Sequence, residues 1–309
     1  MTEAPATMSA PSSPPATGSA PSRAGASRFK GAGNYLALIP FHLYVGLFLL
    51  LPTLYVTLGA FTTLDGQITL DNIVTMFTSD AFIAAFGRSI QLSIETAIIG
   101  SVFGGLLAWA VVRGDPNGLL RQLVISACGV LAQFGGVMLA FSFLATFGFN
   151  GLVTMYLKQT LGTAPDVSWI YSLTGLAVVY SYFQIPLMLI VFLPSLDGLR
   201  QEWYDASASL GGGSWSFWRN VGGPILAPSF LGAFLLLFTN AFSAYATAQA
   251  LISQGCVLIT QQIACQITSE VILGQENVAK ALALGMIVVV SLVMLFYTWI
   301  QRRASRWVK

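Results

Sequence analysis

The chain has 309 residues, of which 55% are hydrophobic and only 8% charged, and fourteen Lys and Arg against twelve Asp and Glu give a net charge of +2. Soluble domains carry about 25% charged residues, so this composition, with a mean hydropathy of +0.74, excludes a soluble globular enzyme and a disordered chain. It predicts a polytopic membrane protein. No concentrated basic patch indicates a nucleic-acid partner. Three Cys and one His leave little material for a structural zinc site, so no metal is expected.

Residues 1–32 differ in composition from the rest of the chain. They contain five of the thirteen Pro, six Ser and eight Ala, but no Leu, Ile or Val. Such a segment buries little apolar surface, so we predict a disordered cytoplasmic tail. It also lacks the apolar stretch of a secretory signal peptide. The transmembrane domain is predicted to occupy residues 33–309.

Six apolar stretches follow the tail, and each is long enough to cross a bilayer as a helix, for which about 20 residues are needed. They are apolar on every side, so length rather than periodicity identifies them. The predicted spans are 35–60, 89–112, 122–147, 169–195, 225–248 and 279–300. The predicted fold class is therefore an all-α polytopic membrane protein with six transmembrane helices.

Lys and Arg residues predict the orientation of these spans, because cytoplasmic loops are enriched in them. With the N-terminus in the cytoplasm, eleven of these residues lie inside and three outside. The inner set is Arg23, Arg28, Lys30, Arg113, Arg121, Arg200, Arg219, Arg302, Arg303, Arg306 and Lys309, and the outer set is Arg88, Lys158 and Lys280. An even number of spans then places both termini in the cytoplasm.

The segment 197–224, between the fourth and fifth spans, is long for a cytoplasmic connection and carries a spaced motif. The motif consists of the triplet Asp205, Ala206 and Ser207, then Gly211, a nine-residue spacer, Val221 and Pro224. This arrangement resembles the E-A-A loop in the permease subunits of binding-protein-dependent ABC importers. Asp stands in place of the usual Glu and Ser in place of the second Ala, while the spacing is intact.

The resemblance implies a type I ABC importer permease fold in a bacterial plasma membrane. It also implies four further partners besides the lipid bilayer: a second permease subunit, two cytoplasmic ATPase subunits that contact the motif residues, and an extracytoplasmic solute-binding protein. ATP and Mg would bind the ATPase subunits, and this chain has no GxxxxGK[ST] motif of its own. We therefore expect it to bind no cofactor and not to be an enzyme.

Shorter segments suggest a branch of that family. The resemblance is to permeases that transport polyamines, opines, phosphonates and ferric iron, and it rests on residues 90–100, 108–114, 182–186, 242–248 and 274–286. The resemblance to this branch implies a solute of one of these types.

The 197–224 segment also predicts its own shape. A helix over residues 199–210 would place Trp203, Ala206 and Leu210 along one face. Gly211 suits a left-handed residue at the end of that helix. A second helix from about residue 214 to 221 is expected to end before Pro224, because the residue before a proline is biased away from helix.

Polar residues inside the spans are candidates for a solute pathway. Glu95 is the one acidic residue within a predicted span, and a carboxylate at that depth usually faces a bundle interior or an aqueous cavity. Structural pairing and contact with the outer interface are alternatives for this residue. The other candidates for the pathway are Tyr182, Gln184, Asn240 and Ser243, for which hydrogen bonding between helices is the alternative.

Two cysteines, Cys256 and Cys265, lie in the predicted outer segment 249–278. That side is outside the reducing cytoplasm, so a disulfide between them is permitted, and two free thiols remain the alternative.

An ion-gradient-driven secondary transporter is the alternative function. Such a protein would have inverted internal repeats and paired broken spans near the bilayer midplane. The sequence contains no convincing internal repeat.

Overall fold

The structure is a computed structural model, and it describes residues 30–63, 65–162, 166–252, 255–268 and 275–304. The chain divides into two compact units, Met1–Thr53 and Leu54–Lys309. In the first unit the described residues form helix α1 (Lys30–Val45), a π-helical turn (Gly46–Leu50) and the start of α2 (Leu51–Ala60). The predicted tail lies outside the described residues as far as residue 29.

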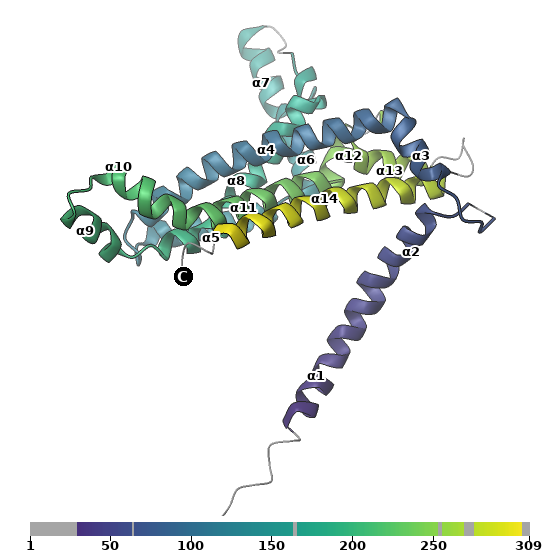
Figure 1. The fold of residues 1–309 in the computed structure, drawn as a ribbon. Coiled ribbons are helices and arrows are strands. Elements are labelled where there is room, and N and C mark those ends of the chain that lie inside the picture. The colour runs from purple at the N-terminus through teal and green to yellow at the C-terminus, as the bar shows by residue number, and fades with distance from the viewer. Residues whose placement is uncertain (1–29, 64, 163–165, 253–254, 269–274, 305–309) are drawn as a thin grey trace, which may run out of the picture. The chain divides into compact units, whose positions relative to one another are not determined.

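The second unit begins at Leu54, near the start of α2, and contains a bundle of helices from α3 to α14 (Figure 1). Its longest members are α4, α8, α11 and α14. The helices are α3 (Asp71–Thr78), α4 (Asp80–Val112), α5 (Leu119–Gln133), α6 (Gly136–Phe147), α7 (Leu152–Leu161), α8 (Leu173–Asp197), α9 (Gln201–Ser209), α10 (Ser214–Phe217), α11 (Gly223–Ser243), α12 (Ala246–Leu251), α13 (Ile259–Thr268) and α14 (Glu276–Ala304). The described residues contain no β-strand beyond one isolated bridge between Thr62 and Ile68.

Six helical segments of the described residues are long and apolar enough to cross a membrane. They are Leu38–Ala60, Asp80–Val112, Gly136–Thr160, Leu173–Asp197, Ser214–Ser243 and Glu276–Arg302. This confirms the prediction of an all-α polytopic chain with six spans. The bounds of three predicted spans are wrong, each for a local reason.

The second span begins earlier than predicted. Helix α4 starts at Asp80, whereas residues up to 88 were expected to belong to an outer connection. Ser79 has extended backbone angles and separates α3 from α4. Asp80 then places a carboxylate in the first turn, where its interaction with the helix dipole stabilises the helix. Phe82 and Ala85 are buried in the bundle, so packing continues the helix beyond the apolar core of the span.

The third predicted span, 122–147, is not one helix. It breaks between α5 and α6 at Phe134 and Gly135, and Gly136 has a φ of +71°, a left-handed conformation that glycine adopts without a Cβ clash. Thr247 Oγ1 donates a hydrogen bond of 3.2 Å to the Gly136 carbonyl, which satisfies one backbone group at this break.

The fifth predicted span, 225–248, is also broken. Helix α11 ends at Ser243, Ala244 has a ψ of 116°, and α12 begins at Ala246. The Ala244 carbonyl accepts hydrogen bonds from Tyr180 Oη at 3.0 Å and from Thr260 Oγ1 at 3.4 Å. Because α12 packs against α6, the two breaks belong to neighbouring helices.

The core of the bundle is the contact between α4 and α8, which is the most extensive of all helix pairs. Gly104 faces the α8 backbone so closely that a Cβ there would lie 2.5 Å from the Ile185 carbonyl oxygen and from Met188 Cβ. A Cβ at Gly100 would likewise lie 2.8 Å from Gln184 Cβ and from Leu237 Cδ2. Small residues one turn apart on α4 therefore let three helices approach one another.

Candidate functional site

Helices α9 and α10 form a hairpin that projects from one end of the bundle, between the end of α8 and the start of α11 (Figure 1). The C-terminal part of α14 and α5 lie at that same end, whereas α3 and α13 lie at the other. We call residues 198–222 the α9–α10 hairpin. It contains all of the predicted ATPase-coupling residues except Pro224.

The turn of the hairpin is built around Gly211, whose φ is +80°. This is the left-handed conformation expected for it from the sequence. The Gly211 N–H donates to the Ala208 carbonyl and the Gly212 N–H to the Ser207 carbonyl, both at 2.9 Å. These two bonds end α9 and turn the chain toward α10.

The second helix does not end before Pro224, contrary to the expectation. Helix α10 continues through a π-helical turn (Trp218–Gly222) into α11. Pro224 lies two residues after the π-helical turn, so the chain stays helical through a residue that has no N–H to donate. The residue before it is Gly223, which has no Cβ to clash with the proline ring, so it keeps helical angles.

The hairpin is held together by its own side chains. Tyr204 Oη lies 3.1 Å from Ser214 Oγ, and the Tyr204 ring contacts the edge of Phe217 with centroids 5.3 Å apart. Phe217 is buried. The two strongly exposed apolar residues are Leu210, at 90% exposure, and Trp215, at 78%. They flank the turn on either side.

Exposure of such large apolar side chains at a hairpin tip needs an explanation. Burying a Leu side chain contributes about 1.5–3 kcal/mol. The described residues of this chain leave Leu210 and Trp215 uncovered. The hairpin tip is therefore a surface that either a partner protein or the membrane interface would cover.

The base of the hairpin is attached firmly to the bundle. Arg121 Nη2 at the start of α5 forms an ion pair of 2.5 Å with Asp197 Oδ2 at the end of α8. Leu199 and Trp218 pack against the buried core of the bundle. A force on the tip would be transmitted through these contacts to α8, α11 and α5.

The predicted coupling residues take different positions in this hairpin. Asp205, Ala206, Gly211 and Pro224 are exposed, whereas Ser207 and Val221 are half-buried. The Asp205 carboxylate accepts a hydrogen bond of 3.3 Å from Gln201 Nε2, one turn earlier on α9. The sequence predicts Leu210 within the first helix, but α9 ends at Ser209 and Leu210 follows it directly. The exposure of Trp215 was not predicted.

The candidate pathway residues Glu95 and Tyr182 line one cavity of about 710 Å³ between α4, α6 and α8. Glu95 is exposed to it, and its Oε1 accepts a hydrogen bond of 2.8 Å from Gln91 Nε2. The Tyr182 ring contacts Phe143 of α6. Thr174, Ser181 and Gln91 add polar groups to the same cavity, and sequence reasoning missed all three.

The other three candidates do not line this cavity. Gln184 is fully buried between α8 and α4, where its Nε2 donates a 2.9 Å hydrogen bond to Thr96 Oγ1. Its Oε1 has no hydrogen-bond partner among the described residues. Asn240 and Ser243 are exposed on α11, and Ser243 Oγ donates to the Thr239 carbonyl at 2.9 Å.

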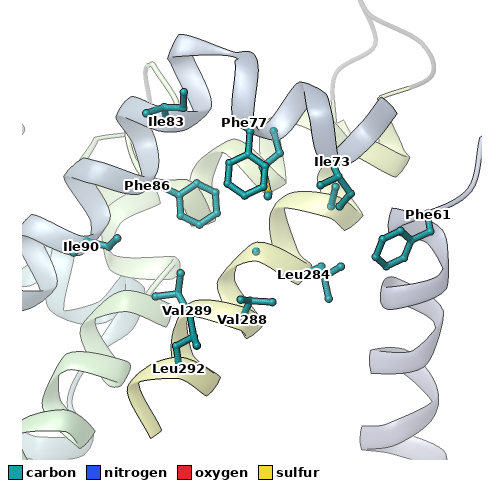
Figure 2. A pocket seen from close by; sticks show the side chains of 13 residues that line it. Phe61, Ile73, Phe77, Ile83, Phe86, Ile90, Leu284, Val288, Val289 and Leu292 are labelled. Carbon is teal, nitrogen blue, oxygen red and sulfur yellow. The ribbon is translucent and has the colours of Figure 1, made fainter. Parts of the chain in front are cut away.

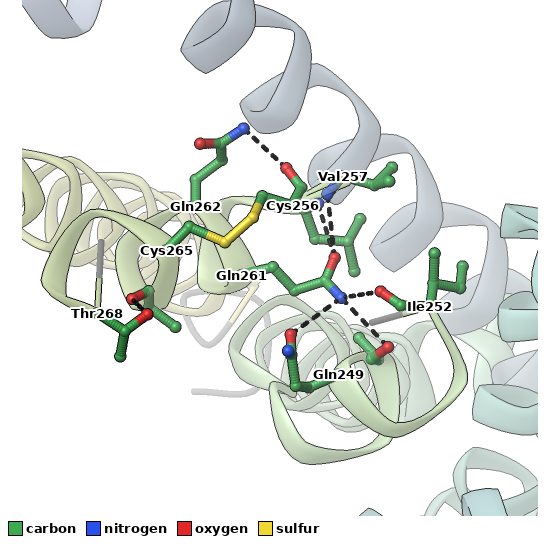
Figure 3. Close-up of a disulfide and its surroundings, with 11 residues drawn as sticks. Gln249, Ile252, Cys256, Val257, Gln261, Gln262, Cys265 and Thr268 are labelled. Carbon is green, nitrogen blue, oxygen red and sulfur yellow. Dashed lines mark hydrogen bonds between the residues drawn. A yellow bond between two sulfur atoms is a disulfide. The ribbon is translucent and has the colours of Figure 1, made fainter. Parts of the chain in front are cut away.

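At the opposite end of the bundle, Cys256 and Cys265 are joined by a disulfide, with their Cα atoms 6.6 Å apart (Figure 3). Gln262 Nε2 donates to the Cys256 carbonyl at 2.7 Å. Gln261 is buried, and its side-chain amide connects two segments. Its Oε1 accepts a hydrogen bond from the Val257 N–H before α13, and its Nε2 donates to the Ile252 carbonyl after α12 at 2.7 Å. Together these contacts fold the connection between α12 and α13 onto the bundle.

The chain is similar to several permeases. No family model matches it. It is 25% identical over 175 residues to a probable sulfate transport system permease protein of Helicosporidium sp. subsp. Simulium jonesii, covering 56% of this chain and 62% of that protein. It therefore spans less than two thirds of that relative's length.

Two further relatives match more of this chain. A probable starch degradation products transport system permease protein of Thermoanaerobacterium thermosulfurigenes is 23% identical and covers 87% of this chain and 94% of that protein. The ferric transport system permease protein FbpB of Actinobacillus pleuropneumoniae is 22% identical and covers 87% of this chain and 38% of that protein.

Among solved structures, the chain resembles a bacterial ABC transporter involved in the import of the acidic polysaccharide alginate. The TM-score is 0.69 at 18% identity, with 89% of this chain and 96% of that chain covered. The predicted fold class is therefore confirmed: this is an all-α membrane protein with the fold of an ABC importer permease subunit. The positions of the two termini relative to the membrane remain a prediction.

Proposed function

We propose that this chain is a permease subunit of an ATP-driven ABC importer and forms the solute pathway together with a second permease subunit. The fold and the permease relatives support this assignment. The observation that carries it is the α9–α10 hairpin at one end of the bundle (Figure 1), where Leu210 and Trp215 are strongly exposed. The E-A-A-like motif lies in that same hairpin.

In this proposal, two cytoplasmic ATPase subunits bind the hairpins of the permease pair. ATP and Mg bind to those subunits, and this chain supplies no cofactor site and no catalytic residue. When the ATPases close, they move the hairpin, and the contacts of Trp218 and the Arg121–Asp197 pair transmit that movement to α5, α8 and α11. The cavity between α4, α6 and α8 then changes its access to the two sides.

The same proposal places the chain in the inner membrane of a bacterium, with both termini in the cytoplasm. The end of the bundle that contains α13 and the disulfide then faces outward. An extracytoplasmic binding protein would deliver the solute to that end. One alginate transporter structure includes a periplasmic protein with bound pentasaccharide, which supports a partner of this kind.

The chemistry of the cavity reduces the number of solute classes that fit it. The relatives are named for sulfate, starch degradation products and ferric transport, and polyamine transport is not among those names. Glu95 presents a carboxylate that pairs with no Lys or Arg among the described residues. A carboxylate at this position disfavours sulfate. We propose a solute with positive charge or with several hydrogen-bond donors, which leaves cationic, metal-complex and sugar solutes.

Co-purification tests the assignment. The tagged full chain is extracted from its native membrane in mild detergent, and the ATP hydrolysis that accompanies it is measured. Leu210→Ser with Trp215→Ser, or Asp205→Lys, is expected to remove most of this activity while the chain stays inserted. Leu152→Ser is the matched control, since Leu152 is 77% exposed on α7 outside the hairpin. Equal ATPase retention by all variants would contradict the proposal.

The secondary transporter deserves a separate test because of the two broken spans. Paired breaks in α5–α6 and α11–α12 are a feature of such transporters. Uptake by proteoliposomes distinguishes the two functions. The importer requires ATP on the ATPase side and works without an ion gradient, whereas a secondary transporter works with the gradient alone.

A further inference from the structure

Lys280 lies in a polar pocket at the beginning of α14, apart from the solute cavity and the hairpin. Its Nζ donates a hydrogen bond of 2.9 Å to Asn277 Oδ1 and one of 3.4 Å to Tyr55 Oη. The ammonium also lies 4.7 Å from the centre of the Tyr55 ring. A pocket of about 330 Å³ surrounds these groups.

The structure around Lys280 holds its side chain in place. Its stem lies directly against Gly59, where a Cβ would collide with the Lys280 methylene groups. Asn277 is buried and donates a 2.8 Å hydrogen bond to the Thr62 carbonyl, so its own orientation is determined by the backbone. The ammonium is therefore positioned and not free to reach far into solvent.

The charge of Lys280 is not neutralised within the described part of the chain. No Asp or Glu oxygen there lies within 4.0 Å of its Nζ. Glu276 lines the same pocket, but it is exposed and forms no ion pair with Lys280. A half-buried cation with neutral hydrogen-bond partners is a suitable site for an anionic group.

An apolar groove of about 540 Å³ lies beside this pocket, between α3, α4 and α14 (Figure 2). Its lining is almost wholly apolar. On α14 the lining begins at Ala281, the residue after Lys280, and ends at Leu292. Phe61 lines the groove, and the next residue in the chain, Thr62, lines the polar pocket.

The groove is open along its length. Phe77 and Val288 on opposite walls are 68% and 48% exposed. Gly285 forms part of the floor, because a Cβ there would lie 2.9 Å from both Met76 Sδ and Phe86 Cζ. From Ala281 to Leu292 the groove follows α14 for roughly 16 Å at 1.5 Å per residue.

The order of these two features along α14 matches one class of ligand. The cationic pocket lies in the first two turns of the span, where a helix leaves the aqueous phase, and the groove continues toward the hydrocarbon core. A phospholipid has the same order of anionic head and apolar tail. We propose that this surface binds a phospholipid, with its phosphate on Lys280, Tyr55 and Asn277 and an acyl chain in the groove.

Native mass spectrometry of the full chain in detergent tests this proposal, with dioleoylphosphatidylglycerol as the probe. Lys280→Gln removes the cation, and Val288→Trp fills the groove. Lys280→Gln is expected to weaken retention of the lipid by about tenfold or more, because a charge-assisted hydrogen bond is lost. Val288→Trp is expected to weaken it by a similar factor, because the indole occupies the space of the acyl chain. The matched controls are Lys158→Gln, on an exposed lysine of α7, and Leu295→Trp, two turns beyond Val288 on α14.

Two further ligands separate the contribution of the phosphate from that of the acyl chains. Dioleoylglycerol has the same tails without phosphate, so its retention should be weaker and should not depend on Lys280. Inorganic phosphate alone should compete poorly. Thermal unfolding and gel filtration confirm that each variant remains folded.

Three results would overturn the proposal. One is equal lipid retention by the Lys280 and Lys158 variants. Another is binding of inorganic phosphate as tight as that of the lipid, with no effect of Val288→Trp, which would mean a site for a free anion. The third is a change of oligomeric state in Val288→Trp with unchanged lipid retention, which would mean that a protein surface covers the groove.

Discussion

The amide of Gln184 on α8 donates a 2.9 Å hydrogen bond to Thr96 Oγ1 on α4, in the fully buried contact between these two helices. Thr96 in turn donates to the Leu92 carbonyl at 2.8 Å. This contact makes Gln184 a link between helices and separates it from the cavity that contains Glu95.

Thr96→Val should destabilise the bundle without changing its shape. The substitution removes the acceptor of Gln184 Nε2 and leaves a buried amide unpaired, at a cost of about 1–2 kcal/mol. Unfolding in mixed micelles measures this. In a double-mutant cycle with Gln184→Leu, the second substitution should cost less in the Thr96→Val background. Additive costs would show that the hydrogen bond contributes no coupling.

Glu95→Gln should reduce or alter uptake while assembly with partner subunits stays intact. The carboxylate faces the cavity and is held by Gln91, so its charge is available to a solute. Uptake kinetics in proteoliposomes measure the effect, and we expect a change of several-fold in KM. Asn240→Ala is the control, because Asn240 lies outside this cavity. Unchanged kinetics for Glu95→Gln would assign it a structural role.

Gly211→Ala should impair the coupling of ATP hydrolysis to uptake. A residue with a side chain pays about 1–2 kcal/mol in the left-handed conformation of Gly211. This penalty is too small to unfold the chain, but it shifts the tip of the hairpin. The ratio of solute transported to ATP hydrolysed is the measurement.

The control for that experiment is Gly213→Ala. Gly213 has a φ of −79° and no atom within 4 Å of an added Cβ, so alanine fits there without strain. Equal coupling in both alanine variants would mean that the conformation of the turn does not matter for the contact with the ATPase.

Reduction of the Cys256–Cys265 disulfide should lower the melting temperature of the chain. The bond closes a short loop with a sequence separation of 9, for which the chain-entropy relation gives about 2–3 kcal/mol. Thiol titration under denaturing conditions should find one thiol, Cys128, before reduction and three after it. The Cys256→Ser/Cys265→Ser variant is the control, and its melting temperature should not respond to reductant.

Local sequence was a good guide where one residue type decides the backbone. Gly211 was assigned a left-handed turn from its position between two helical segments, and its φ agrees. Gly135 and Gly136 carried a comparable signal, but they stand within an apolar stretch long enough to span a membrane. The prediction of spans uses only the length and polarity of a stretch, so it joined α5 and α6 into one span.

For the candidate pathway residues, too, the sequence identified polar side chains but not their surroundings. Glu95, Tyr182 and Gln184 were selected because polar groups are costly in a bilayer. That cost is met by a cavity in the case of Glu95 and by the Thr96 hydroxyl in the case of Gln184. Sequence alone does not distinguish these outcomes, since the partner of Gln184 is 88 residues away.

The class of this protein, the number of its spans and the location of its E-A-A-like motif can be obtained from the sequence, because hydrophobic length and residue spacing are local properties of the chain. The folded structure shows where α6 and α12 begin and which polar groups share a cavity. It also shows that Lys280 lies at one end of an apolar groove. These features depend on contacts between helices distant in sequence, where a backbone carbonyl such as that of Ala244 finds its partners on α8 and α13.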